Sequence, residues 1–415
     1  MGGSKKMVTL KTKNMKSDKK QVLFYTMIHS ILFSILLISC YSQDYKPYVY
    51  QSPTNINDEI SVGTLDEVGI NTQLVTKGIN RILSGRHGEI HSLLMYKDGK
   101  LVLEEYFEGS KFKWDAPGHR GEWVSWKPDM LHRIHSDTKS ITAICIGIAI
   151  DQGFIGSVDQ SIFDYLPDHQ HLKKDGKEKI TIEHLLTMTS GLHWYEWGAP
   201  YSSAENPIIG IWYSDLDPVS FILNGSLEHA PGTHYSYYGG HQILLGEILK
   251  YASGMTIDEF SKQYLFEPLA IDTVNWSTKF EDGVFEAAGG LEMRPRDMAK
   301  VGITFLNDGV WQSTQILDKH WIQKTANPYP GNERINVPGT DERRVGYSYS
   351  WWTKSITDGS KSSNIYWAGG WGGQRILVAP EYNTVIVFTG GSYLSKVKQM
   401  KLVEKYLLPA LNSKI

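Results

Sequence analysis

The stretch SLLMYKDGKLVLEEYF, residues 92–107, decides the fold near the start of the chain. Its Asp98-Gly99 dipeptide separates two runs rich in β-forming residues, which is a strong local signal for a hairpin. A second pair of such runs stands near the other end, where QRILVAP (374–380) and TVIVF (384–388) flank a three-residue turn. Apolar residues then recur at roughly helical spacing over residues 397–407. The sequence therefore predicts strand pairs at both ends and a closing helix.

The middle of the chain is predicted to be mainly helical. Its clearest helical segments are residues 136–152, 182–188, 240–251 and 295–307. Strands at both ends that enclose helices indicate an α+β architecture, in which N- and C-terminal strands form one antiparallel sheet packed with helices. A mainly helical region is then inserted between them. We expect this body to span residues 65–412.

A targeting segment precedes the body. Residues 5–20 contain seven lysines and one aspartate, and residues 22–39 contain no charge. The apolar run ends in Leu-Ile-Ser-Cys40, which resembles the bacterial lipobox, where signal cleavage leaves the cysteine as a lipid-carrying N-terminus. Residues 1–40 are therefore predicted to be a lipoprotein signal with Cys40 as the lipidation site. A plain transmembrane anchor is the alternative, because roughly 18 to 20 apolar residues can span a bilayer.

The residues that follow Cys40 are polar and include Pro47 and Pro53, so residues 41–64 are predicted to be a tether. The protein is then expected in the bacterial envelope, held at a membrane by its lipid and facing the periplasm or the cell surface. Synthesis can also start at Met7 or Met15, since the basic lead is long for a signal.

Charge and cysteine content exclude several classes of function. The first 40 residues account for seven of the 42 basic and one of the 45 acidic residues, so the remaining chain carries nine excess negative charges. This disfavours nucleic-acid binding. Cys145 lies in an apolar run and is expected to be a buried thiol, which leaves no pair for a disulfide in the body. His87 and His91 have the spacing of a helical zinc pair, but Gly88 and the strand that follows argue against a helix, so no metal and no cofactor are predicted.

The pattern Ser-x-x-Lys occurs four times, beginning at Ser17, Ser110, Ser136 and Ser395. Ser17 lies in the basic lead, Ser110 in a turn rich in Gly and Lys, and Ser395 at the start of the last helix. Only Ser136 opens a helix that is apolar on nearly all sides, as a helix in the middle of a domain must be. Ser136 and Lys139 are three positions apart and share a face, so the amine can reach the hydroxyl. An isolated match would indicate a helix cap followed by a solvated lysine.

Further stretches, in order, make the chain resemble the β-lactamase and penicillin-binding family, in particular class C β-lactamases and related esterases. They are residues 131–139 (LHRIHSDTK), 180–192 (ITIEHLLTMTSGL), 231–240 (PGTHYSYYGG), 245–249 (LGEIL), 266–269 (FEPL), 289–291 (GGL) with 296–298 (RDM), and 369–374 (GGWGGQ). The resemblance implies the β-lactamase and transpeptidase fold and a serine hydrolase with Ser136 as nucleophile and Lys139 as its base.

The family's second motif, Tyr-x-Asn after a Pro-Gly-Thr turn, falls on Tyr237-Tyr238-Gly239. The resemblance implies that Tyr237 relays protons during acylation, with Tyr235 and Tyr238 as competing candidates. The asparagine is replaced by Gly239.

The third motif, normally Lys-Thr-Gly or His-x-Gly, reads Ala368-Gly369-Gly370. In the family, the first side chain of this motif binds substrate carboxylates, and Ala368 cannot do so. A backbone N–H, in contrast, is present whatever the side chain is. The resemblance therefore implies an oxyanion hole made by the N–H groups of Ser136 and Trp371.

These two losses decide the expected substrate. Neither Gly239 nor Ala368 supplies the usual partners of β-lactams and D-Ala-D-Ala peptides, and Arg375 or Lys300 would have to replace them. We therefore expect an esterase or amidase first and a β-lactamase or D,D-peptidase second. A penicillin-binding-like sensor that does not turn over is an alternative of another class, and a zinc hydrolase is a third. The substrate is expected to be a small molecule, a peptide or an acylated carbohydrate, and five tryptophans in or beside the motifs can stack on it: Trp194, Trp197, Trp351, Trp352 and Trp371.

Overall fold

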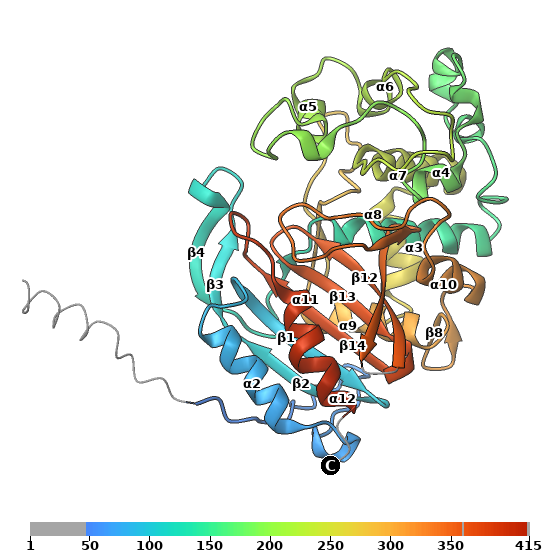
Figure 1. The fold of residues 1–415 in the computed structure, drawn as a ribbon. Helices are drawn as coiled ribbons and strands as arrows, with labels where there is room; N and C mark the ends of the chain where they lie inside the picture. Colours follow the sequence, from blue (N-terminus) through green and yellow to red (C-terminus); the bar gives the residue numbers. More distant parts are fainter. Residues whose placement is uncertain (1–46, 359–360, 413–415) are drawn as a thin grey trace, which may run out of the picture. The chain divides into compact units, whose positions relative to one another are not determined.

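In the computed structural model, which describes residues 47–358 and 361–412, strands from both ends of the chain form one sheet. All its neighbouring strands are antiparallel, and their order is β10-β11-β12-β13-β14-β1-β2 (Figure 1). Their bounds are β1 (Ile90–Lys97), β2 (Lys100–Tyr106), β10 (Gly346–Ser348), β11 (Trp351–Asp358), β12 (Lys361–Gly370), β13 (Gln374–Ala379) and β14 (Thr384–Gly390). Because β1 pairs with β14, the predicted joining of the two ends in one sheet is confirmed.

The turn between β1 and β2 has the backbone that its sequence predicts. Asp98 and Gly99 both have positive φ, 48° and 87°. Two successive left-handed residues form the turn whose twist matches that of a hairpin, and Asp-Gly adopts it at low cost. Local turn chemistry therefore sets the two pairs next to the turn, and the register shifts once further along, between Met95 and Tyr96.

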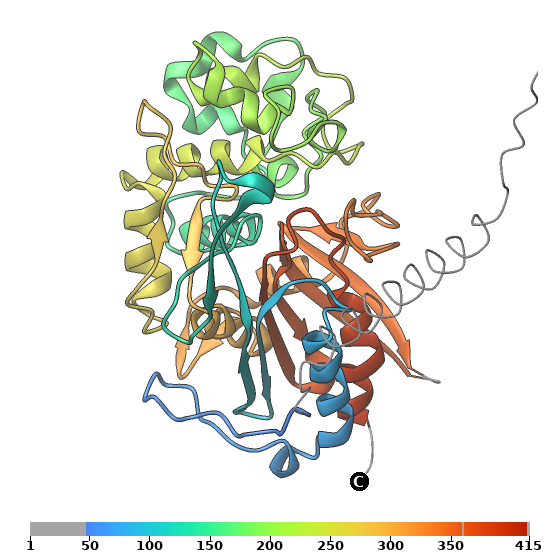
Figure 2. The same ribbon diagram turned by 90° about the vertical axis from the view of Figure 1, so that its left-hand side faces the viewer.

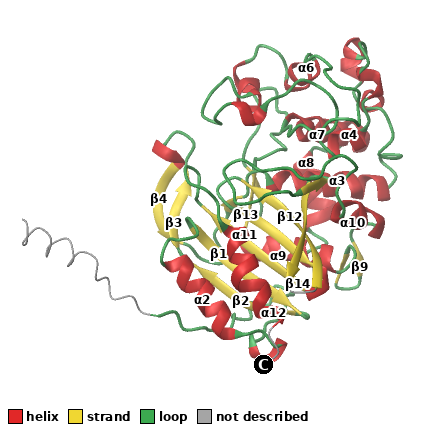
Figure 3. Ribbon diagram, viewed as in Figure 1, coloured by secondary structure: helices red, strands yellow, loops and turns green. Residues whose placement is uncertain are grey.

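Helices cover both faces of the sheet (Figures 1 and 3). One face carries α9 (Pro295–Leu306), which contacts β1, β13 and β14. Gly302 permits this close packing, since a Cβ there would lie 2.5 Å from Val385 Cγ1. The other face carries α2 (Thr72–Leu83), α11 (Gln399–Leu402) and α12 (Leu408–Asn412). The predicted closing helix thus packs with a helix from the start of the body.

The inserted region lies at one end of the sheet and is mainly helical, as predicted (Figures 1 and 2). Its central helix is α3 (Asp137–Asp151), which contacts α7 and β12. Every residue of α3 from Asp137 to Ala149 is buried, Cys145 included, in agreement with its apolar surface in the sequence. The other helices are α4 (Ile182–Leu186), α5 (Pro207–Gly210), α6 (Pro218–Leu223), α7 (Gly240–Ser253), α8 (Ile257–Ser261) and α10 (Lys319–Ala326).

Three small sheets complete the body. The pair β3 (Glu108–Phe112) and β4 (Arg120–Ser125) forms a ribbon that extends toward the inserted region (Figures 1 and 2). Ser110, which the sequence places in a turn, is buried within β3. The remaining strands are β5 (His132–Arg133), β6 (Asn275–Trp276), β7 (Leu291–Met293), β8 (Val310–Trp311) and β9 (Thr314–Gln315).

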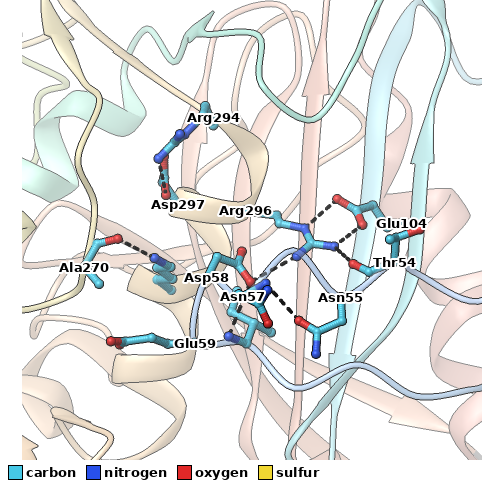
Figure 4. A network of polar contacts seen from close by, with 12 residues as sticks. Thr54, Asn55, Asn57, Asp58, Glu59, Glu104, Ala270, Arg294, Arg296 and Asp297 are labelled. Carbon is cyan, nitrogen blue, oxygen red and sulfur yellow. Dashed lines mark hydrogen bonds and ion pairs between the residues drawn. The ribbon is translucent and has the colours of Figure 1, made fainter.

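The body begins before residue 65, because the chain from Tyr50 onward packs on it. The Tyr50 hydroxyl donates to Val102 O at 2.8 Å. The Arg296 guanidinium on α9 binds Asp58 (3.1 Å), Thr54 O (2.7 Å) and both carboxylate oxygens of Glu104 on β2 (Figure 4). Residues 50–64, expected to be a tether, are thus held by a buried arginine. The predicted signal and Cys40 lie outside the described residues, and no helix within those residues is long and apolar enough to cross a membrane.

Candidate active site

Ser136 stands at the first turn of α3, where the chain leaves β5. His135 before it has φ of +48°, a strained backbone for a residue with a side chain, and the chain turns sharply there. The Ser136 hydroxyl makes no capping bond to the helix. Instead its Oγ accepts a hydrogen bond from Lys139 Nζ at 3.1 Å. The two residues that the sequence singled out are therefore in contact.

Lys139 is buried, with 3% of its surface exposed. Its ammonium group also donates to Ala288 O at 2.9 Å. Burial lowers the pKa of Lys139, and the nearby carboxyl groups of Glu196 and Glu286 act in the opposite direction. A lysine of lowered pKa beside a serine hydroxyl can accept its proton more readily than an exposed lysine can.

Tyr237 is the tyrosine of its segment that reaches the nucleophile. It lines the second cavity together with Ser136, and Lys139 Nζ lies 5.2 Å from the centre of its ring. The ring lies nearly parallel to those of Trp197 and Trp352, with centroid distances of 5.1 and 6.0 Å. Burial raises the pKa of Tyr237 well above its ordinary value, so its phenol stays protonated at neutral pH.

The two competing tyrosines pack against other aromatic rings, Tyr238 in the core and Tyr235 in a half-buried position. Tyr238 stacks between Trp194 and His241, with ring centroids 4.0 Å away on each side. Tyr235 packs edge-on against Tyr347, and its buried hydroxyl has no partner among the described residues. Neither tyrosine lines a cavity that contains Ser136.

The end of β12 lies against the segment that leads into the nucleophile. A Cβ at Gly370 would lie 2.2 Å from Ile134 O, so only glycine permits this approach. Trp371 follows directly and lines the same two cavities as Ser136. Gly370 is therefore needed for close packing, and Ala368 is fully buried and lines neither cavity.

Gly239 also has a neighbour in the space where a side chain would stand. A Cβ there would lie 2.9 Å from Glu196 Oε2 and 2.9 Å from Ile208 Cδ1. Glu196 accepts hydrogen bonds from the Gly239 N–H (2.5 Å), Trp194 Nε1 (2.9 Å) and the Tyr201 hydroxyl (3.0 Å). Glu196 was not predicted from the sequence as a residue of the site. The only signal was the glycine in place of asparagine, which shows that a side chain is lost but does not indicate which residue fills its place.

Two cavities meet at Ser136. The first, of about 370 Å³, has a mainly aromatic and aliphatic wall with Arg133, Glu196 and Glu286 among its polar groups. Its apolar lining is Phe112, Trp114, Ile208, Ile209, Trp212, Tyr213 and Trp371. The second, of about 470 Å³, contains Tyr237, Glu196 and the loop that follows β14. Of the five tryptophans expected to rim the site, Trp197, Trp352 and Trp371 line a cavity, whereas Trp194 and Trp351 are buried in the core.

The cations proposed to bind a substrate carboxylate are engaged elsewhere. Arg375 is buried in an ion pair with Glu342, although it borders the second cavity. Lys300 lines neither cavity and donates to Ala270 O at 2.6 Å. Arg133 borders the first cavity, where its Nε donates to Gly289 O (3.2 Å).

No group of three or more His, Cys, Asp or Glu side chains within residues 47–358 and 361–412 is placed to hold a metal ion. His91 lies in β1 and pairs with Glu89 at 3.1 Å, whereas His87 contacts Lys398 O at 3.0 Å. The two histidines of the helical zinc spacing therefore have separate partners.

Glu286 provides a test of the electrostatics of this pocket. Its carboxyl is 7% exposed, and its Oε1 accepts from Ala288 N at 3.2 Å. Burial raises its pKa to about 7, against the attraction of Arg133 and Lys139. The fold thus favours the protonated form, and this contribution to stability is present below pH ~4.5 and is lost as pH rises through about 7.

We expect Glu286→Gln to stabilise the protein at pH 8 by about 2 to 3 kcal/mol and to leave stability at pH 4.5 nearly unchanged. The glutamine keeps the acceptor for Ala288 N and removes the charge. Urea unfolding at the two pH values measures the difference, with the exposed Glu281→Gln as control. Equal effects of Glu286→Gln at both pH values would contradict a carboxyl that ionises near pH 7 in the fold.

The comparisons with known proteins agree with this geometry. A family model described as Beta-lactamase matches residues 91–390. A 6-aminohexanoate-dimer hydrolase of Paenarthrobacter ureafaciens is 25% identical over 301 residues, 70% of this chain and 69% of that protein. Esterase EstB of Burkholderia gladioli is 29% identical over 151 residues, 35% of this chain and 38% of that protein. The crystal structure of a family VIII carboxylesterase has a similar fold, with a TM-score of 0.59, 16% identity, and coverage of 81% of this chain and 96% of that one. The chain therefore belongs to the β-lactamase family and is a serine hydrolase.

Proposed function

We propose that this hydrolase cleaves an ester or amide bond through an acyl-enzyme on Ser136, and that its substrate carries no carboxylate next to the scissile bond. The observation that carries the proposal is the hydrogen bond between Ser136 and Lys139 where two cavities meet, with Tyr237 in the wall of one of them. The Glu196 carboxylate lies beside Gly239, at the place of the usual second-motif asparagine.

In acylation, neutral Lys139 takes the proton of Ser136, and Oγ attacks the carbonyl carbon of the substrate. The N–H groups of Ser136 and Trp371 stabilise the oxyanion of the tetrahedral intermediate, a contribution of about 3 kcal/mol per donor in other hydrolases. The protonated phenol of Tyr237 donates to the leaving group and recovers a proton from Lys139. Water then attacks the acyl-enzyme along the same route.

Recognition is proposed to use the two cavities for the two sides of the scissile bond. The aromatic wall of the first cavity suits an apolar or ring-bearing group. Similar proteins named as an esterase and as a 6-aminohexanoate-dimer hydrolase support this class of substrate. β-Lactamase or D,D-peptidase activity is the second candidate, since similar proteins are also named a D-alanyl-D-alanine carboxypeptidase and a penicillin-binding protein.

The experiment that tests the chemistry is labelling with a fluorophosphonate, followed by turnover of short p-nitrophenyl esters. We expect stoichiometric labelling at Ser136 and multiple turnovers per enzyme. A protein that is labelled, or acylated by a penicillin, but releases no more than one product per molecule would instead be a sensor. Inhibition by a chelator would point to the zinc alternative.

We further propose that the protein is exported and anchored by a lipid on Cys40, and that cleavage of the signal before Cys40 leaves this residue as the N-terminus. The lipobox-like Leu-Ile-Ser-Cys40 after an uncharged run supports this location in the bacterial envelope. Palmitate labelling in cells should mark the protein, and Cys40→Ala should abolish it while Cys145→Ala keeps it. Equal labelling of wild type and Cys40→Ala would remove the lipoprotein proposal.

A further inference from the structure

Among the residues that the structure describes, Glu196 is the one carboxylate that lines both cavities at Ser136. It belongs to the loop between α4 and α5, far in sequence from the Tyr237 turn. Only 2% of its surface is exposed, and no Lys, Arg or His within the described residues forms an ion pair with it. A buried carboxylate without a paired cation is costly and calls for a functional reason.

We propose that Glu196 takes the place of the lost second-motif side chain and acts as a positioning residue for Lys139 and Tyr237. The inference rests on the proposed serine hydrolase chemistry and adds a residue to it. Two observations carry it: the way the carboxylate holds the Tyr237 turn, and the charge that it presents to Lys139.

The first observation concerns hydrogen bonds. Oε2 accepts from the Gly239 N–H at 2.5 Å, two residues after Tyr237, and thus ties down the turn that carries the phenol. Trp194 and Tyr201 donate to the same carboxylate and fix its orientation. Three donors suit an ionised carboxylate, which only accepts. Gly239 must be glycine in this arrangement, because the carboxylate fills the space of its Cβ.

The second observation concerns charge. Lys139, Glu196 and Glu286 line the first cavity together, and Asp137 stands two residues before Lys139 in the chain. All three carboxyl groups act to raise the pKa of Lys139 against its burial, and Glu196 has the largest effect of the three. Asp137 is fully buried with neither oxygen hydrogen-bonded among the described residues, and burial raises its pKa well above the ordinary range. His135 is neutral, since burial lowers its pKa well below the ordinary value. Glu196 therefore opposes the loss of the proton from the Lys139 ammonium more strongly than its neighbours do.

The rate of fluorophosphonate labelling as a function of pH tests the inference without a known substrate. Its rise with pH reports deprotonation of the base that activates Ser136. Glu196→Gln can keep all three hydrogen bonds, with the amide donating to Tyr201, but it removes the charge. We expect this rise to move to lower pH by about one unit, so that labelling below the wild-type midpoint becomes severalfold faster.

Three further variants are compared with Glu196→Gln in the same labelling experiment. Glu196→Asp keeps the charge, and its curve should stay near that of wild type. Tyr201→Phe removes one donor to the carboxylate, and we expect its curve to move to higher pH. Glu205→Gln, an exposed acid of the same loop, is the control and should not change the curve.

The inference would be overturned if Glu196→Gln folds like wild type but its labelling rate rises at the same or a higher pH. A carboxylate with a merely structural role would leave the curve in that position. If Glu196→Gln does not fold, an unchanged curve for Tyr201→Phe would overturn it. Absence of labelling in wild type at every pH would instead contradict the proposed serine hydrolase chemistry, so the two failures are distinguishable.

Discussion

Ser136→Ala is expected to lower turnover of an activated ester by about ten-thousandfold or more and to abolish fluorophosphonate labelling. The alanine removes the only atom that can form the acyl bond, whereas binding and the oxyanion N–H groups remain. The fold should persist, because Ser136 Oγ makes no helix cap and Lys139 keeps its bond to Ala288 O. We expect the free energy of unfolding to change by less than about 1 kcal/mol.

The matched control is Ser395→Ala, which removes the hydroxyl of another Ser-x-x-Lys pattern. Ser395 is exposed and lines the second cavity but is not the nucleophile in our proposal. Turnover should persist far above that of Ser136→Ala, since the alanine at 395 removes no atom that forms the acyl bond, although its place in the cavity wall can change the KM. Substantial activity in Ser136→Ala, or its loss in Ser395→Ala, would show that the wrong serine was chosen.

Features set by local sequence could be predicted well. The β1–β2 turn depends on Asp98 and Gly99 alone, and two β-rich runs around a three-residue turn predicted β13 and β14. Ser136 could be selected among four matches because an apolar surface all around a helix indicates burial on every side. That burial is present in α3.

Features that depend on long-range contacts could not be predicted from the sequence. Residues 50–64 look like a tether because they are polar, yet Arg296, more than 200 positions away, binds Thr54 and Asp58. Arg375 was a candidate for binding a substrate carboxylate because nothing in the sequence around it indicates that Glu342 is its ion-pair partner. Composition describes what a segment can do alone, whereas these outcomes depend on which segments meet.

Glu196 shows both what the sequence could indicate and what it could not. The glycine at 239 correctly indicated a change in recognition, but the residue that fills the gap lies 43 positions away. A pocket can therefore keep the shape of its family site while exchanging an amide for a carboxylate. The exchange has a direct consequence for substrates that carry a negative charge.

Wild-type protein is expected to show a specificity constant for p-nitrophenyl butyrate at least about a hundredfold above that for nitrocefin, whose carboxylate would need a cation in the site. A missing charge-assisted hydrogen bond costs about 1.5 to 3 kcal/mol, which is about ten- to a hundredfold in binding. The buried carboxylate of Glu196 adds repulsion to that loss, and Arg375 is already paired with Glu342. The measurement compares initial rates of both substrates on the same purified protein.

The matched variant is again Glu196→Gln, which should raise nitrocefin turnover relative to ester turnover, since removal of an anion favours only the charged substrate. A neutral ester reports the general effect of the substitution on catalysis, and the ratio isolates the charge. If nitrocefin were the better substrate of the wild type by tenfold or more, some cation must bind its carboxylate. Arg133 would then be the first residue to replace, because it borders the first cavity and no carboxylate within the described residues forms an ion pair with it.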